Sequence, residues 1–132
     1  MIKQVFYIPI LLVICFFAAC KPSIKPENLY GKWKYIKIEH PNADPTEMPP
    51  AQLQSQSPSI EFSKNNGYII IWGGKILSHG IFTTDGRNIR IKENLPDGTT
   101  REFPFWVSEL TDKEIVFETK GEDGSRFTAV RE

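Results

Sequence analysis

Regularly spaced turn signals constrain the fold of this chain more than any other feature of its sequence. From residue 66 onward, pairs such as Asn-Gly, Gly-Gly and Asp-Gly recur at intervals of roughly 7 to 14 residues. Apolar and polar residues alternate between these turns with the period of two that is typical of β-strands. No stretch after residue 28 shows a helical period. We therefore expect eight strands, at residues 31–39, 60–62, 68–72, 76–84, 88–92, 101–110, 114–119 and 125–131.

Short strands joined by tight hairpins favour one architecture. The sequence predicts an all-β, eight-stranded, up-and-down antiparallel barrel, in which every strand has two neighbours. Such a barrel holds its own side chains or one small ligand. The apolar residues between 33 and 38 switch faces, which predicts a bulge or burial of both faces. Gly80 predicts a bend or bulge, and Pro104 predicts a bulge or a partial sheet edge because it lacks an N–H donor.

The first twenty residues predict export. Lys3 gives a cationic start, and residues 5–19 form an uncharged apolar run of roughly 15 residues, which is short for a membrane span. Residues 17–20, Phe-Ala-Ala-Cys, resemble the lipobox of bacterial lipoproteins. Two open alternatives are an ordinary signal peptide with a chance cysteine and an uncleaved anchor.

The lipobox resemblance implies a processed and anchored protein. Residues 1–19 would be the signal peptide, residues 20–28 a lipidated tether, and residues 29–132 the barrel domain. Cys20 would be acylated, for example by palmitate, and would fix the protein to a membrane of the bacterial cell envelope. Some similar lipoproteins of the Bacteroidetes carry an acidic run just after the cysteine as a surface-export signal. This chain has none there, so the resemblance favours the periplasmic face of the outer membrane. Cys15 would leave with the signal, so no disulfide is expected.

The first expected strand carries a Gly-x-Trp sequence, Gly31-Lys32-Trp33. A Gly-x-Trp on a first strand, followed by a meander, resembles the lipocalin superfamily, and in particular the lipocalin-like domains of lipoproteins of the Bacteroidetes type. The resemblance implies that Trp33 closes the base of the barrel beneath a basic residue of the last strand. Arg126 and Arg131 are the two candidates for that residue.

The remaining aromatic residues bear on whether the barrel has a cavity. If some of them stand back from the centre, they line an apolar site for a small hydrophobic ligand; the candidates are Tyr68, Trp72, Phe82, Phe103 and Phe105. If they fill the interior, the protein is instead a non-enzymatic module that engages another envelope protein. The loop at 40–58 holds five prolines, which exclude regular structure, and it is either a lid over the barrel or a solvated linker.

Several function classes are not supported by the sequence. The two histidines, His40 and His79, lie in no metal-ligand spacing, and no serine or cysteine has a base at a suitable spacing. We therefore expect no enzyme activity, no catalytic residue, no metal and no cofactor. Without Lys3 the chain carries 15 basic residues (16 minus 1) against 16 acidic ones, so no basic field for nucleic acid is expected.

Overall fold

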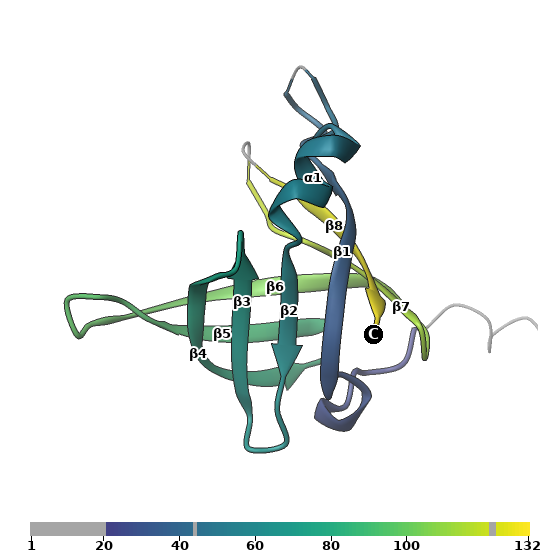
Figure 1. The fold of residues 1–132 in the computed structure, drawn as a ribbon. Helices are drawn as coiled ribbons and strands as arrows, with labels where there is room; N and C mark the ends of the chain where they lie inside the picture. Colours follow the sequence, from purple (N-terminus) through teal and green to yellow (C-terminus); the bar gives the residue numbers. More distant parts are fainter. Residues whose placement is uncertain (1–20, 44, 122–123) are drawn as a thin grey trace, which may run out of the picture.

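A computed structural model describes residues 21–43, 45–121 and 124–132. The predicted signal peptide and the predicted acylation site at Cys20 lie outside the described residues. Eight antiparallel strands close into a barrel, and each strand pairs with its neighbours in chain order (Figure 1). The predicted all-β, up-and-down barrel is confirmed. The strands are β1 (Gly31–Glu39), β2 (Ser59–Phe62), β3 (Gly67–Trp72), β4 (Lys75–Asp85), β5 (Asn88–Asn94), β6 (Thr100–Leu110), β7 (Glu114–Glu118) and β8 (Arg126–Arg131).

The two ends of the barrel differ in what covers them. The base end carries the start of β1, the end of β8 and the β2–β3, β4–β5 and β6–β7 turns. The mouth end carries the β3–β4, β5–β6 and β7–β8 turns and the helix α1 (Pro50–Gln56). Figure 1 shows α1 above the upper end of β2 and the β5–β6 hairpin projecting well away from the barrel.

The helix α1 corrects the prediction that the prolines of the 40–58 loop exclude regular structure. Pro49 is the N-cap and Pro50 the first helical residue, positions where no backbone donor is needed. Leu53 is buried against the barrel and Ser57 ends the helix in a left-handed conformation. The N–H of Gly73, in the β3–β4 turn, donates to the carbonyl of Gln56 (2.7 Å). The loop is therefore fastened to the mouth end.

Two predicted irregularities are found where the sequence places them. The β1–β8 pairing shifts register between Tyr35 and Lys37, so Trp33, Tyr35 and Ile38 are all buried. Ile36 lies on the outer side and is 48% exposed. Pro104 pairs with β5, whereas the β6–β7 pairing extends only from Trp106 to Leu110. The first half of β6 is therefore a partial edge, as Pro104 predicts.

Gly80 is not bulged, because the β3–β4 register shift lies between Ile70 and Ile71. Its role is close packing instead. A Cβ at this position would lie 2.0 Å from the carbonyl oxygen of Lys92 and 3.1 Å from the Tyr68 ring. Only glycine allows β4 and β5 to approach this closely.

Residues 21–28, which the sequence predicts to be a tether, pack along the base end. A short 3₁₀ turn spans Pro26–Asn28. Ile24 is 5% exposed, and its N–H donates to the carbonyl of Gly86 (2.8 Å). Arg87 donates to the carbonyl of Pro22 (3.0 Å), and the Lys21 ammonium donates to the carbonyl of Ser108 (2.6 Å). The segment therefore contributes Ile24 to the core of the barrel, and hydrogen bonds hold it to the barrel.

Candidate ligand site

The structure brings Gly31, Trp33 and Arg131 together at the base. The Arg131 guanidinium lies 4.1 Å from the centre of the fully buried Trp33 ring, which is cation–π geometry. The Trp33 indole N–H donates to the carbonyl of Leu29 (2.8 Å). Gly31 has φ +122°, and a Cβ there would lie 2.8 Å from the Arg131 Nη1 atom. Glycine therefore makes room for the arginine that covers the tryptophan.

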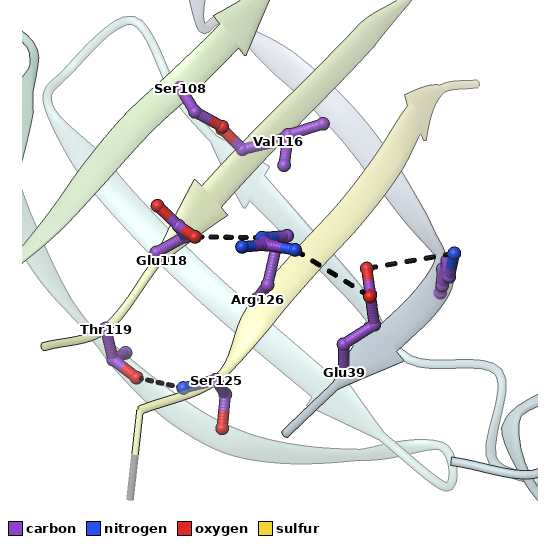
Figure 2. A network of polar contacts seen from close by, with 8 residues as sticks. Glu39, Ser108, Val116, Glu118, Thr119, Ser125 and Arg126 are labelled. Carbon is purple, nitrogen blue, oxygen red and sulfur yellow. Dashed lines mark hydrogen bonds and ion pairs between the residues drawn. The ribbon is translucent and has the colours of Figure 1, made fainter. Parts of the chain in front are cut away.

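Arg126, the other candidate for that position, lies at the mouth end and does not reach Trp33. Figure 2 shows it between two carboxylates, from β7 and β1. Its Nε donates to Glu118 (2.8 Å), and its Nη1 forms an ion pair with Glu39 (3.8 Å). The hydrogen bond from Arg126 to Glu118 raises the pKa of the guanidinium, which keeps it charged. Arg126 thus ties three neighbouring strands together on the outer surface.

The five aromatic residues proposed to line a cavity divide into two groups. Tyr68 and Phe82 are each 1% exposed and Phe105 is 5% exposed, so all three belong to the packed core. Phe103 and Trp72 are half-buried and pack against that core. Only these two of the five present a surface to solvent.

Aromatic rings fill the mouth half of the interior. Ring centres are 5.4 Å apart for Phe103 and Phe105, 4.9 Å for Phe105 and Phe117, and 5.2 Å for Phe117 and Phe127. Tyr35 closes the series, 5.5 Å from Phe127. These separations are those of packed aromatic pairs. A ligand therefore has no ready-made space along this series of rings.

A polar network runs through the same interior. Glu93 is 7% exposed and accepts hydrogen bonds from the Ser78 hydroxyl (2.6 Å) and from Nε (3.0 Å) and Nη2 (2.5 Å) of Arg101. Ser78 gives its single proton to this carboxylate, so the Tyr68 hydroxyl, 2.8 Å away, donates to Ser78. Burial raises the pKa of the Tyr68 hydroxyl and the Glu93 charge adds to the rise, whereas the hydrogen bond with Ser78 and the Arg101 charge offset part of it. The network holds the Arg101 guanidinium in one place.

The partial edge of β6 borders a hollow, which we call the side opening. Its volume is about 310 Å³, and Phe103 and Pro104 form its apolar wall. Arg101, whose guanidinium lies 5.3 Å from the Phe103 ring centre, flanks this wall, and Thr119 and Lys120 close the far side. The side opening therefore combines an apolar surface with two cations, one of them fixed by a buried carboxylate.

Comparison with solved structures identifies the fold. A lipocalin-like protein from Bacteroides uniformis ATCC 8492 aligns with a TM-score of 0.57 and 16% identity, over 80% of this chain and 99% of that one. The domain is a lipocalin-like barrel. An uncharacterized protein from Bacteroides eggerthii DSM 20697 aligns with a TM-score of 0.56 and 18% identity, over 79% of this chain and 99% of that one. No protein-family model and no curated protein matches the sequence.

These likenesses confirm the predicted lipocalin-like domain and show the fold alone. Within residues 21–43, 45–121 and 124–132, no helix is long and apolar enough to cross a membrane. The same residues contain no group of three or more potential metal ligands. The ring nitrogen of His40 lies 2.9 Å from the Ser125 hydroxyl, and that of His79 lies 3.5 Å from the Asn94 amide.

Sequence analysis missed the polar part of the site in this lipocalin-like barrel. Ile89 and Ile91 of β5 are buried, and the same alternation carried two residues further places Glu93 inside as well. The expected strand ended at Lys92, one residue too early for that step. Arg101 is opposite Glu93 in the β5–β6 pairing, so a longer hairpin would have identified the pair.

The outer face of β3 and β4 carries a group of aliphatic side chains. Ile69 and Ile71 of β3 are half-buried. On β4, Ile76 is 60% exposed, Leu77 64% and Ile81 50%. Aliphatic residues gathered on one face of neighbouring strands are typical of a surface that contacts something other than water.

Proposed function

We propose that this protein is a lipid-anchored lipoprotein of the bacterial cell envelope, and that it binds a small amphipathic molecule at the side opening. The binding proposal depends on the combination of an apolar wall and two cations at the side opening. Phe103 and Pro104 give an apolar wall, and Arg101 and Lys120 give two cations. The volume of about 310 Å³ reaches the lower end of the range for ligand pockets, about 300 Å³.

Because side chains fill the interior, we place the proposed ligand at the side of the barrel. Burial of Tyr68, Phe82 and Phe105 leaves no room for a ligand at the centre without rearrangement of the core. The ligand's apolar part would instead lie along Phe103 and Pro104. Its anionic group would meet Arg101 and Lys120, because guanidinium and ammonium groups bind carboxylate and phosphate.

The test uses the unacylated Cys20→Ser protein and cis-parinaric acid, a fluorescent fatty acid. We expect saturable fluorescence enhancement. Lys120→Glu reverses one charge at the side opening and should weaken binding about tenfold, which corresponds to about 1.4 kcal/mol. Lys75→Glu makes the same charge change at the exposed first residue of β4 and should change affinity less than about twofold.

Two results would count against a site at the side opening. One is the absence of saturable binding, and the other is equal weakening by Lys120→Glu and Lys75→Glu. The methyl ester of the same fatty acid separates the two parts of the site. If the ester binds as tightly as the acid, the cations are not used and the ligand is purely apolar.

A second function, an interaction module for another envelope protein, is favoured by the exposed aliphatic face of β4. A photocrosslinking residue in place of Leu77 should give one discrete protein adduct in living cells. Replacement of Glu61, an exposed residue on the outside of β2, provides the matched control and should give none. Equal crosslinking from both positions would argue against a specific partner on this face.

A further inference from the structure

We propose that the base end of the barrel rests directly on the lipid bilayer, with the mouth end and the side opening facing away from it. The inference depends on the proposed acylation of Cys20 and adds an orientation to it. It identifies the base-end turns as a membrane-contacting surface. The occupant of this surface is a layer of lipid headgroups.

The first argument is that residues 21–28, which follow the predicted anchor, are packed against the barrel and not extended. Eight residues, 21–28, would reach about 26–29 Å if they were fully extended. Instead, Lys21 donates to the carbonyl of Ser108 in β6, and Ile24 is buried and bonded to Gly86 in the β4–β5 turn. Lys21 is the residue directly after the predicted acylation site. The described chain is therefore held to the barrel up to the residue directly after the predicted acylation site.

The second argument is the position of this segment. Gly86, Arg87 and the end of β6 all belong to the base end, and Figure 1 shows the 21–28 segment (purple) at the end opposite to α1. An anchor held against one end of a barrel brings that end to the membrane. The β3–β4, β5–β6 and β7–β8 turns then point into the aqueous phase.

The third argument is charge. Each of the three base-end turns carries a cation, namely Lys64, Arg87 and Lys113. Two acidic residues lie close to these cations. Asp85 forms an ion pair with Arg90 (2.8 Å), and Asp112 is the neighbour of Lys113 in the sequence. The other acidic residues near this end are Glu27, Glu61, Glu109, Glu114 and Glu132, and Glu132 pairs with Lys32 (3.6 Å). A lysine or arginine near an anionic surface contributes about 1 kcal/mol to binding, so these turns suit contact with anionic headgroups.

The experiment uses the full acylated protein in vesicles of phosphatidylethanolamine and phosphatidylglycerol that contain a headgroup spin-labelled lipid. The acylated chain has no free thiol, because Cys20 is modified and Cys15 is removed. A single cysteine is introduced as Lys64→Cys at the base or Lys75→Cys at the mouth, and each is labelled with a fluorophore. We expect the spin label to quench the fluorophore at 64 at least threefold more than the one at 75.

A second variant tests the docked segment. Twelve Gly/Ser residues inserted between Cys20 and Lys21 leave every described contact of residues 21–28 intact. They add a flexible spacer of roughly 20 Å root-mean-square length. Quenching at 64 should then fall to the level found at 75. Unchanged quenching after the insertion would mean that something other than the short anchor sets the orientation, and would overturn the inference.

The possible failures are distinguishable. Flotation of the protein with the vesicles reports acylation, independent of orientation. If the protein floats with the vesicles and the fluorophores at 64 and 75 are quenched equally, the proposed orientation is wrong and the proposed lipid anchor is supported. If the protein does not float and mass spectrometry finds no acyl chain, the anchoring part of the proposed function is wrong and the orientation falls with it.

Discussion

Replacement of Arg131 by alanine tests the packing at the barrel base. The guanidinium covers Trp33 at 4.1 Å, and it also bridges three backbone carbonyls. Nε donates to Asp112 (2.8 Å), Nη2 donates to Asn28 (3.0 Å), and Nη1 donates to Tyr30. One side chain therefore connects β8 to the β6–β7 turn and to the residues that lead into β1.

The magnitude follows from these contacts. A cation–π contact with a buried tryptophan contributes about 1 kcal/mol. Hydrogen bonds from a charged donor contribute about 1.5–3 kcal/mol each when buried, but two of these three are exposed, so we assign roughly 0.7 kcal/mol to each. Arg131→Ala should therefore lower the free energy of unfolding by about 3 kcal/mol. With a urea m-value of about 1.5 kcal/mol/M, the unfolding midpoint falls by about 2 M.

Arg126→Ala is the matched control, because it removes the same side chain from the same strand. Arg126 is 42% exposed and pairs with Glu118 and Glu39 on the surface, where solvent screening leaves ion pairs with little effect on stability. Urea unfolding followed by far-ultraviolet circular dichroism measures both variants. A loss for Arg126→Ala equal to or larger than that for Arg131→Ala would refute the assignment of Arg131 to the base. Trp33→Ala should cost about 3–5 kcal/mol in the same assay.

Three further outcomes are expected. Cys20→Ser should abolish acylation, seen as loss of lipid mass and of membrane retention; retention without lipid would contradict the lipobox. Gly80→Ala should destabilise the barrel by more than about 3 kcal/mol, because its Cβ would meet a β5 carbonyl oxygen at 2.0 Å, whereas Gly74→Ala (φ +79°, open space) should cost about 1–2 kcal/mol. Burial raises the pKa of Tyr35 and of Tyr68, so the folded state holds their protons more tightly than the unfolded state does. Stability should therefore be unaffected by these groups below about pH 10 and should fall as the pH rises above it, and Tyr68→Phe should reduce that fall in thermal melts; an unchanged slope would contradict the shift.

Local patterns were sufficient to predict the barrel. The hairpin turns at Asn66-Gly67, Gly73-Gly74 and Asp85-Gly86 fix where strands end, and period-two alternation fixes which side chains point inward. The helix α1 was missed because only Leu53 of its seven residues is buried, so the helix shows no apolar periodicity. Its presence depends on contacts with Gly73 and the barrel surface, which are distant in the sequence.

The candidate site was predicted less well than the fold, because aromatic residues alone do not distinguish a cavity from a core. Tyr68, Phe82 and Phe105 were candidates for a ligand site or for the core, and the structure places all three in the packed core. The distinction depends on total side-chain volume inside a closed barrel, which is a property of all the strands together. The choice between Arg126 and Arg131 depended on which end of β8 meets the start of β1, and antiparallel pairing places Arg131 beside Trp33.

The half of β6 that does not pair with β7 has a consequence for self-association. In the described part of the chain, residues 100–105 pair with β5 on one side and are not paired with β7 on the other, so this half of β6 is a partial edge of the sheet. Edges of this kind recruit strands from other molecules and start aggregation. Pro104 stands in the middle of this one and removes a backbone donor, which interrupts any added ladder. The proline that lines the side opening therefore also hinders the pairing of this edge with strands of other molecules.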